Sequence, residues 1–286
     1  MSASDLSAEK DANPPLVLPA AEAGWRAALT LGFAQRAGRT YLARRQHIGP
    51  LLVQRPFHPE GDVCHAYLVH PPGGVVGGDE LRLEVQVGRS AHALLTTPAA
   101  TKFYRSAGRL ARQTQRLCVE DGTLEWLPQE TIFYSGARVR SATHLHLTRS
   151  ARLIAWEIAC LGLPARQEDF TAGELALDFE IWVEQVPRLV DRLRIRGGDC
   201  ARTALWGVAG YRAIGILAAY PADAEALLAV RDIDQSLAAT RVDGLLVCRC
   251  VADQAQDVRR TFTKVWQVLR PRLLERAPMP PRIWAT

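Results

Sequence analysis

The feature that most constrains this chain of 286 residues is an alternation of apolar and polar side chains, which persists from about residue 24 to about residue 205. Residues 81–87 and 142–147 alternate cleanly, and residues 175–183 place their apolar side chains at every second position. In residues 189–196 the apolar positions alternate with arginines. Successive side chains of a β-strand point to opposite faces of its sheet, so the pattern predicts strands with one buried face and one face covered by water or by a partner.

Short turn signals separate these strands. Glycine- and proline-rich stretches lie at residues 71–74, 77–79 and 196–199, where turns are expected. Asp121-Gly122 lies between two strand-like segments and predicts a β-hairpin. The number of short strands predicts an all-β core, which could be a solenoid, a sandwich or a barrel. No internal repeat of fixed length is visible, so a regular repeat protein is not supported.

Two later segments have helical spacing instead. Apolar residues recur every three or four positions after Asp223, which we predict to be the N-cap of a helix. Residues 253–275 predict a second helix, with Asp253 as its cap and with Pro271 kinking or ending it. Residues 244–251 between them predict a buried strand. The expected fold is therefore mainly β, with two α-helices in the C-terminal half.

The distribution of apolar residues also predicts the domain organisation. Residues 1–23 are polar, rich in alanine and punctuated by proline, which predicts a flexible tail before a single domain over residues 24–286. Arg212 interrupts the longest apolar run, at residues 207–220, so we expect no transmembrane helix. No apolar segment follows a basic start, as a secretory signal would require. We therefore expect a cytoplasmic protein whose six scattered cysteines are free thiols, mostly in the core.

The net charge of +5 and the pI of about 9.0 leave two kinds of partner open, a nucleic acid and an acidic protein. The arginines are spread along the chain, without a block of five or six basic residues. Nucleic-acid binding usually clusters its basic residues, so the spread weighs against it.

Two local motifs could carry chemistry but fit structural roles better. The glycine-rich stretch at residues 73–78 ends in Asp79 and leads into a strand. A phosphate-binding loop would instead open a helix with Gly-Lys-Ser or Gly-Lys-Thr, so we interpret this stretch as a tight turn. Lys102 lies beside Tyr104 and Arg105, but no nucleophile or triad accompanies it. We interpret this trio as an internal ion-pair site or a partner-facing site.

The sequence contains carboxylates and imidazoles that could bind a metal ion weakly, but no complete set of metal ligands. Glu125 and Glu130 lie five residues apart, and a pair of carboxylates would suit glycosidase chemistry only if the two converged. His65 and His70 fall in a segment, residues 58–70, that also holds a third histidine and a cysteine. Imidazole and thiolate suit nickel and zinc, but no complete ligand pattern is present. We therefore predict no catalytic residues and no fixed metal site, and leave transient metal contact open.

Four longer motifs, taken together in this order, resemble the UreD family of urease accessory proteins. They are PPGGVVGGDELRLEV, LLTTPAATKFYRS, LEWLPQETIFYSGA and PRLVDRLRIRGGD. The resemblance runs from about Gly24 to the C-terminal helices, so it covers nearly the whole chain. It implies a β-helix-like or solenoid-like stack of short strands with two helices.

The resemblance also implies a function, that of a non-enzymatic maturation factor. Such a factor joins a UreF-type helical partner and a UreG-type GTPase, and the assembly docks on apo-urease. Ni²⁺ then reaches the urease active site through an internal passage across this chain. The GTPase partner would bind the GTP, so this chain would hold no tight cofactor and only transient Ni²⁺, and would bind neither nucleic acid nor membrane.

A wet passage should bind the ion weakly at several points and release it onward, whereas a closed site would trap it. Carboxylates and a few imidazoles suit such a path. Our candidates for it are Asp79, Glu125, Glu130, Asp191, His65 and His70. We assign structural or partner-facing roles to Gly77, Gly78, Lys102, Tyr104 and Arg105.

Two other functions stay open from the residues. A carbohydrate-active or lyase-like enzyme on a β-solenoid would need convergent carboxylates, or a set of Lys, Tyr and Arg, in an open groove. Finding Lys102, Tyr104 and Glu130 together in such a groove would favour it. A basic nucleic-acid-binding protein would show affinity that falls steeply with salt.

Overall fold

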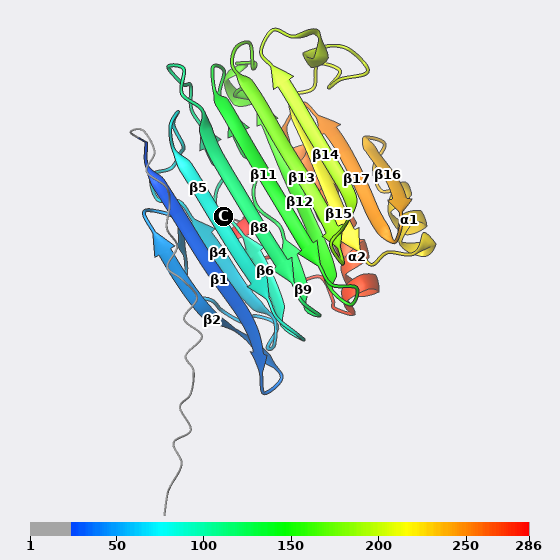
Figure 1. The fold of residues 1–286 in the computed structure, drawn as a ribbon. Coiled ribbons are helices and arrows are strands. Elements are labelled where there is room, and N and C mark those ends of the chain that lie inside the picture. Colours follow the sequence, from blue (N-terminus) through cyan, green and yellow to red (C-terminus); the bar gives the residue numbers. More distant parts are fainter. Residues whose placement is uncertain (1–23, 286) are drawn as a thin grey trace, which may run out of the picture.

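Two β-sheets stacked face to face form most of the molecule in the computed structural model, which describes residues 24–285 (Figure 1). The seven-stranded sheet contains, in spatial order, β14 (Val186–Arg196), β13 (Glu174–Val183), β11 (Arg138–Leu147), β8 (Ala111–Val119), β5 (Glu80–Val87), β1 (Arg26–Arg36) and β2 (Arg39–Ile48). The predicted strands over residues 81–87, 142–147, 175–183 and 189–196 are confirmed.

The second sheet has ten strands. Eight of them lie, in spatial order, as β16 (Leu237–Val242), β17 (Leu245–Ala252), β15 (Ala213–Tyr220), β12 (Arg152–Leu161), β9 (Thr123–Trp126), β6 (His92–Thr96), β4 (Cys64–Val69) and β3 (Leu52–Val53). Off this path, β10 (Thr131–Phe133) pairs with β12 and with β7 (Thr101–Phe103). The strand predicted at residues 244–251 is therefore confirmed as β17.

Parallel pairing dominates the centre of both sheets. In the first sheet β1, β5, β8, β11 and β13 are parallel neighbours, and in the second β4, β6, β9 and β12 are. Along the chain, β8 belongs to the first sheet, β9 to the second, β11 to the first and β12 to the second. Successive passages of the chain therefore cross from one sheet to the other.

The hairpin predicted at Asp121-Gly122 is wrong, because this turn joins β8 of one sheet to β9 of the other. Contacts with neighbouring turns fix it instead. Asp121 Oδ1 accepts a hydrogen bond of 2.9 Å from the Thr148 hydroxyl. A Cβ atom on Gly122 would lie 2.5 Å from the carbonyl oxygen of Gly88, so only glycine fits against the preceding turn.

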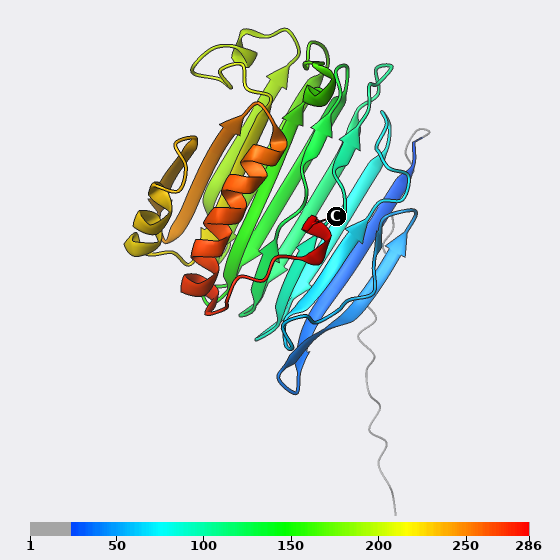
Figure 2. The ribbon, with the colours of Figure 1, turned by 180° about the vertical axis from the view of Figure 1, so that it is seen from behind.

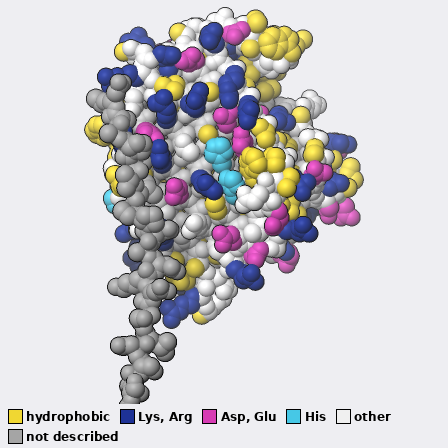
Figure 3. All heavy atoms as spheres, viewed as in Figure 1, with side chains coloured by type: hydrophobic (Ala, Val, Ile, Leu, Met, Phe, Trp, Pro, Cys, Tyr) yellow, Lys and Arg dark blue, Asp and Glu magenta, His cyan; other side chains and the backbone are white. Residues whose placement is uncertain are grey.

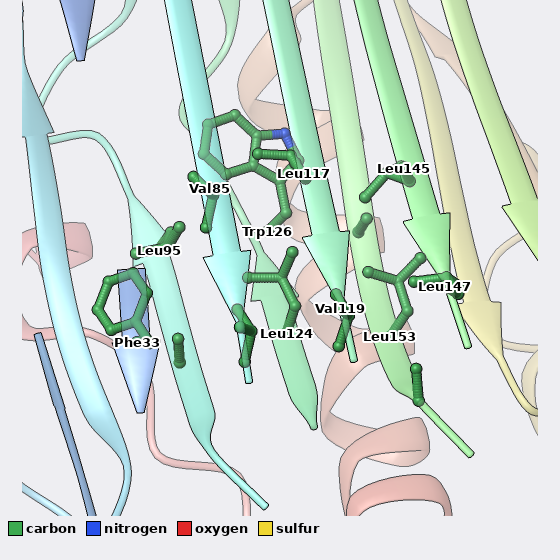
Figure 4. Close-up of a cluster of buried hydrophobic side chains, with 14 of the residues drawn as sticks. Phe33, Val85, Leu95, Leu117, Val119, Leu124, Trp126, Leu145, Leu147 and Leu153 are labelled. Carbon is green, nitrogen blue, oxygen red and sulfur yellow. The ribbon is translucent and has the colours of Figure 1, made fainter. Parts of the chain in front are cut away.

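The alternation predicted from the sequence builds the core between the sheets. Inward-facing side chains of both sheets interlock in the cluster drawn in Figure 4, among them Val85 and Leu117 from one sheet and Leu95 and Leu124 from the other. Each is at most 1 % exposed. Burying one such side chain contributes about 2 kcal/mol, so this cluster is a main source of stability.

Two α-helices lie in the C-terminal half, as expected. Helix α1 (Ala224–Arg231) begins at the predicted N-cap, where the Asp223 carboxylate accepts a hydrogen bond of 2.8 Å from the Ala226 N–H. Helix α2 (Ala255–Leu274) lies across the outer face of the ten-stranded sheet (Figure 2). Its Phe262 packs on β15, where a Cβ atom on Gly215 would meet the Phe262 ring at 2.6 Å.

Two details of helix α2 differ from expectation. Gln254, not Asp253, is the N-cap, and its side chain forms no capping hydrogen bond. Pro271 was expected to kink or end the helix, and α2 does not end there but continues to Leu274. A proline in the last turn forfeits one backbone hydrogen bond, and the buried stripe that ends in Leu269 and Leu274 holds this turn on the sheet.

Three short 3₁₀ helices complete the described elements, namely η1 (Pro164–Arg166), η2 (Cys200–Arg202) and η3 (Arg282–Ala285). None of the described helices covers the outer face of the seven-stranded sheet (Figures 1 and 2). Charged side chains of both signs and histidines are scattered over that face in Figure 3. A mainly parallel sheet usually has both faces covered, so this bare face is unusual.

The predicted class, mainly β with two helices in the C-terminal half, is confirmed. The predicted tail at residues 1–23 lies outside the described residues. Within residues 24–285, no helix combines the length and the apolar character needed to cross a membrane. All six cysteines are free, and four of them are buried, as expected.

Candidate functional site

A cavity of about 250 Å³ lies between the two sheets. Leu81 and Leu83 line it from the seven-stranded sheet, and Trp126 and Ile158 from the ten-stranded sheet. Polar and ionisable side chains share the lining, namely His70, Thr97, Thr101, Lys102, Gln113, Gln115, Gln129, Thr131, Ser141 and Glu157. A cavity of this composition can hold water or a hydrated ion.

The sequence creates this cavity by changing the side chains on the inward face of β8 and β11. In β8 the inward positions Gln113 and Gln115 precede Leu117 and Val119. In β11 the inward positions that pair with these glutamines are Ser141 and Thr143, and Leu145 and Leu147 follow them. The same strands therefore supply an apolar core along one half of their length and a polar cavity wall along the other.

Glu157 faces this cavity from the opposite sheet. In β12 it lies on the inward face, which it shares with the core residues Leu153 and Ala155 at every second position. The Thr143 hydroxyl donates a hydrogen bond to Glu157 Oε1 across the gap between the sheets. Burial raises the pKa of Glu157 to about 7, although the hydrogen bond from Thr143 acts to lower it. The carboxyl can therefore gain or lose a proton near neutral pH.

Two polar atoms of the cavity wall have no protein partner. Gln115 Oε1 and Trp126 Nε1 are both buried without a hydrogen bond among the described residues. An unpaired buried acceptor or donor costs about 1–3 kcal/mol, and native structures satisfy nearly all such groups. These two atoms therefore call for a polar occupant, such as water or the hydration shell of an ion.

Of the residues predicted for a metal path, only His70 lines the cavity. Burial lowers the pKa of His70, partly offset by the charge of Asp79, so the neutral imidazole that could accept a metal is favoured. Lys102 on β7, predicted to have a structural or partner-facing role, also lines the cavity. Tyr104 and Glu130 do not line it, so this cavity does not hold the group of Lys102, Tyr104 and Glu130 that would have favoured an enzyme.

Glu125 and His65 belong to a separate network beneath helix α2. Glu125 Oε2 accepts hydrogen bonds from Trp266 Nε1 at 2.6 Å and from Arg270 Nε at 3.0 Å. The same guanidinium donates to Glu60 at 2.7 Å. His65 Nε2 lies 2.7 Å from Glu60 Oε1. His92 Nε2 lies 2.8 Å from Glu125 Oε1 and completes the network.

The charges of this network hold both carboxylates ionised. Burial acts to raise the pKa of Glu60, but His65 and Arg270 outweigh it and lower that pKa to about 2. The pKa of Glu125 is also lowered, because His92 and Arg270 outweigh its burial. The Arg270 guanidinium thus lies where a cation bound by the two carboxylates would lie. Among residues 24–285, no group of three or more His, Cys, Asp or Glu side chains could hold a metal ion.

Asp79, Gly77 and Gly78 form a tight turn at the start of β5. Asp79 accepts hydrogen bonds from the backbone N–H groups of Trp25 and Val76, both at 2.9 Å. A Cβ atom on Gly77 would lie 2.2 Å from the Ser106 hydroxyl oxygen, and Gly78 has a φ of +102°. The contacts of these residues are those of a fixed turn.

Glu130 and Asp191 each face an arginine. Glu130 lies 4.0 Å from Arg259 of helix α2. Asp191 on β14 pairs at 2.6 Å with Arg249 on β17, and so links the two sheets. The structure therefore places the six predicted path residues at several locations, and of these Glu125 and His65 share one network.

Tyr104 and Arg105 pack against glycines near one end of the sheets. The Tyr104 ring lies 5.0 Å from the Tyr134 ring, and a Cβ atom on Gly74 would meet it at 2.1 Å. A Cβ atom on Gly136 would likewise lie 2.6 Å from Cγ of the Arg105 side chain. Both side chains therefore help to hold neighbouring loops together.

Sequence reasoning missed Glu157, Gln113 and Gln115 at the cavity. A signal was present, because Glu157 is a lone carboxylate inside the apolar segment Arg152–Leu161. The two glutamines replace apolar residues on the inward face of an alternating strand. Polar residues on a face that should be buried indicate a wet cavity or a buried polar network.

The fold and the cavity define a mainly β protein whose paired sheets line a cavity with both apolar and polar side chains. A sequence model of the family described as UreD urease accessory protein matches residues 26–285. The chain belongs to this family of urease accessory proteins, and membership places it among accessory proteins and not among enzymes.

Curated relatives match along nearly their whole length. A urease accessory protein UreD of Enterobacter sp. (strain 638) is 45 % identical over 268 residues, which cover 92 % of this chain and 96 % of the relative. One of Klebsiella pneumoniae subsp. pneumoniae is 46 % identical over 275 residues, covering 94 % and 98 %. One of Alkalilimnicola ehrlichii is 47 % identical over 270 residues, covering 92 % of each chain.

Proposed function

We propose that this chain supports urease maturation by guiding Ni²⁺ through its internal cavity toward apo-urease. Membership of the urease accessory family supports the maturation role. The polar and ionisable side chains that line the cavity between the sheets support the route. The ion would be cargo, held weakly and passed on, which agrees with a lining that has one carboxyl and one imidazole, several amides and hydroxyls, and the Lys102 amine.

The observation that carries this proposal is the Glu157 carboxyl inside the cavity. Its pKa of about 7 means that an arriving cation can displace the proton easily, and that a returning proton can help to release the cation. Gln115 Oε1, which has no protein partner in the described structure, can accept a hydrogen bond from a water of the hydrated ion. His70 is the second cavity residue able to accept Ni²⁺ directly. Asp79, Glu125, Glu130, Asp191 and His65 stay predictions for this path.

We also propose that the chain is a scaffold for other proteins in the cytoplasm. A UreF-type partner and a UreG-type GTPase would assemble on it, and the assembly would dock on apo-urease. The GTPase would bind the nucleotide, so this chain would need no cofactor of its own. The bare outer face of the seven-stranded sheet (Figure 3) supports contact with a protein partner.

We infer further that the body is a solenoid-like coil. The parallel pairing of β5, β8, β11 and β13, together with the alternation of the chain between the two sheets, supports this description. Each passage would then stack on the one before it, and the cavity would lie inside the coil.

Nickel transfer tests the proposed route. Urease and all its accessory proteins are co-expressed at limiting nickel, with this chain as wild type or as Glu157→Gln, and the nickel bound per urease is measured. The Gln side chain keeps the size and the acceptor for Thr143 but cannot become negative. We expect nickel loading to fall roughly tenfold, the lower end of the loss seen when a metal-site partner is removed.

Glu225→Gln is the matched control, because Glu225 is an exposed glutamate on helix α1, away from the cavity and from the outer face of the seven-stranded sheet. It should leave nickel loading unchanged. Co-purification of the accessory complex with apo-urease shows whether assembly survives in each variant. Normal nickel loading with Glu157→Gln in an intact complex would refute the route through the cavity.

A further inference from the structure

A second concave site lies at the opposite side of the molecule from helix α1, where the turn between β1 and β2 meets the loop between β3 and β4. This groove has a volume of about 730 Å³. Its wall includes Arg36, Arg39, Tyr41, Arg55, Phe57 and His58. Basic and aromatic side chains thus line one continuous hollow, which shares no lining residue with the cavity between the sheets.

The groove has no carboxylate in its lining. The acidic residues in the described chain up to residue 63 are Glu60 and Asp62, and both are committed elsewhere. Glu60 is bound by Arg270, and Asp62 by Arg276 at 2.8 Å. Within residues 24–285, Arg36, Arg39 and Arg55 form no ion pair with a side chain. Three exposed guanidinium groups therefore concentrate positive charge over the hollow.

The groove opens beside a free sheet edge. Strand β2 is the last strand of the seven-stranded sheet. The Thr40 N–H, at its start, donates to the Asp62 carbonyl at 2.9 Å. From Tyr41 to Ile48 the outer edge of β2 has no strand partner among the described residues. The side chains of Tyr41 and Ile48 are 42 % and 45 % exposed, so this edge is open to a ligand.

We propose that the groove and the β2 edge bind an acidic, extended segment of a partner protein. Its carboxylates would pair with Arg36, Arg39 and Arg55, because charge-assisted hydrogen bonds from arginine to carboxylate are strong and directional. Its backbone would pair with the free N–H and C=O groups of β2, as in strand addition to a sheet edge. Only a polypeptide matches both features, since a nucleic acid has no backbone that can extend a β-sheet.

This inference does not depend on the proposed nickel path, and peptide binding tests it directly. The probe is a fluorescein-labelled peptide of four Glu-Val repeats, titrated with the full-length protein and followed by fluorescence anisotropy. We expect saturable binding that weakens as the salt concentration rises from about 50 to about 300 mM, because added ions screen exposed charges. Arg39→Glu/Arg55→Glu should weaken binding at least about tenfold.

A second double variant, Arg231→Glu/Arg241→Glu, is the matched control. It also reverses two exposed arginines, on α1 and on the edge strand β16, without touching the groove, and it should bind the peptide like wild type. The milder variant Arg39→Gln/Arg55→Gln removes both charges without reversing them and should weaken binding about threefold. It shows whether binding is lost even where the fold is less disturbed. A peptide methylated at alternate backbone nitrogens should bind more weakly, because it cannot pair along the β2 edge.

Three outcomes would overturn the proposal. One is equal binding by the two charge-reversed variants. Another is binding of a Lys-Val peptide, or of an oligouridylate of equal charge, at least as tight as that of the Glu-Val peptide. The third is undiminished binding of the methylated peptide, which would remove the strand-addition mode.

Discussion

The Glu157 carboxyl experiences two opposing influences inside the cavity. Burial disfavours its charge, and the Thr143 hydroxyl stabilises it, with burial the stronger. The carboxyl is therefore protonated in the folded chain over a range of pH in which an exposed glutamate would be ionised. Such a group makes the folding stability depend on pH.

We expect Glu157→Gln to change that dependence. Between its ordinary pKa of 4.5 and its folded value of about 7, the unfolded chain releases the Glu157 proton while the folded chain keeps it. Wild-type stability should therefore fall as the pH rises through this window, and the contribution should level off above it. The Gln variant lacks this loss, so its melting temperature minus that of wild type should rise between pH 4.5 and pH 7 and then stay constant.

Thermal unfolding at half-unit steps of pH measures this difference, with Glu225→Gln, at an exposed glutamate on helix α1, as the control. Parallel curves for wild type and Glu157→Gln would show that the carboxyl has an ordinary pKa and that the cavity does not shield it.

Residue types alone indicated which side chains could carry charge, but not what each one meets. Asp79 and Glu125 were predicted for a metal path as carboxylates in suggestive motifs, and their partners are backbone N–H groups and a buried arginine. Arg270 lies 145 residues from Glu125 in the sequence, and no local pattern connects such positions. Glu157 could have been found from its place in an apolar strand, because that signal is local.

Helix α2 is joined to the ten-stranded sheet by charge as well as by apolar packing. Arg270 is fully buried, and it lies between Glu60 and Glu125. The two carboxylates raise its pKa although burial acts to lower it. Removing one partner of a buried ion pair leaves the other charge uncompensated, and this costs about 3–5 kcal/mol.

We expect Arg270→Met to lower the free energy of unfolding by about that amount, measured by urea denaturation. Arg272→Met is the control on the same helix, because Arg272 is exposed and should change stability by less than about 0.5 kcal/mol. Glu60→Gln is a milder test of the same contact. In wild type the stabilisation from Glu60 is complete above pH 4.5 and is lost as the pH falls toward about 2, and Glu60→Gln should lack this loss. Equal stability of Arg270→Met and Arg272→Met would contradict a role for the network.

Elements were predictable where one local pattern decides them. The strands at residues 81–87 and 175–183 and the cap at Asp223 follow from side-chain alternation and from capping chemistry, both of which act over a few residues. The turn at Asp121-Gly122 was misread because Asp-Gly favours a hairpin locally, while contacts with Thr148 and with the Gly88 turn carry the chain into the other sheet. Pro271 does not end the helix, because apolar burial of the last helical turn compensates for one lost hydrogen bond.

At the scale of the whole molecule, a loop beyond β14 presents large apolar side chains to solvent. Leu205 is 92 % exposed and Trp206 is 75 % exposed. Buried Arg202 anchors the loop through its hydrogen bonds to Asp169 at 2.5 Å and to the Tyr211 carbonyl at 2.7 Å. A fixed apolar patch of this kind favours self-association when a protein is alone in solution.

We expect Leu205→Ser/Trp206→Ser to reduce that self-association without destabilising the fold. Static light scattering over a concentration series should show a smaller mean mass for the variant, and its free energy of unfolding should stay within about 0.5 kcal/mol of wild type. Leu228→Ser, at a 64 % exposed position on α1, is the control for loss of a single exposed leucine elsewhere. An unchanged mass distribution in the double variant would show that the loop is not responsible.

The mainly β class was predictable at this scale, because alternation extends over most of the chain. The arrangement of the strands was not, since β8 and β9 are adjacent in sequence yet belong to different sheets. Which sheet a strand joins depends on packing against strands some 30 residues away, such as the pairing of Leu81 with Gln113. Side-chain period carries no information about that choice.

The contact between Arg270 and Glu60 joins groups 210 residues apart, and it has a consequence for biosynthesis. During synthesis, Glu60 and Glu125 are added to the chain long before Arg270, the arginine that pairs with both of them. A nascent chain cut short before residue 270 would leave the carboxylates of Glu60 and Glu125 without the arginine that pairs with both of them. In truncated products helix α2 should therefore not pack stably on the ten-stranded sheet, and such products should be degraded. Only chains synthesised nearly to their C-terminus would then bind other proteins.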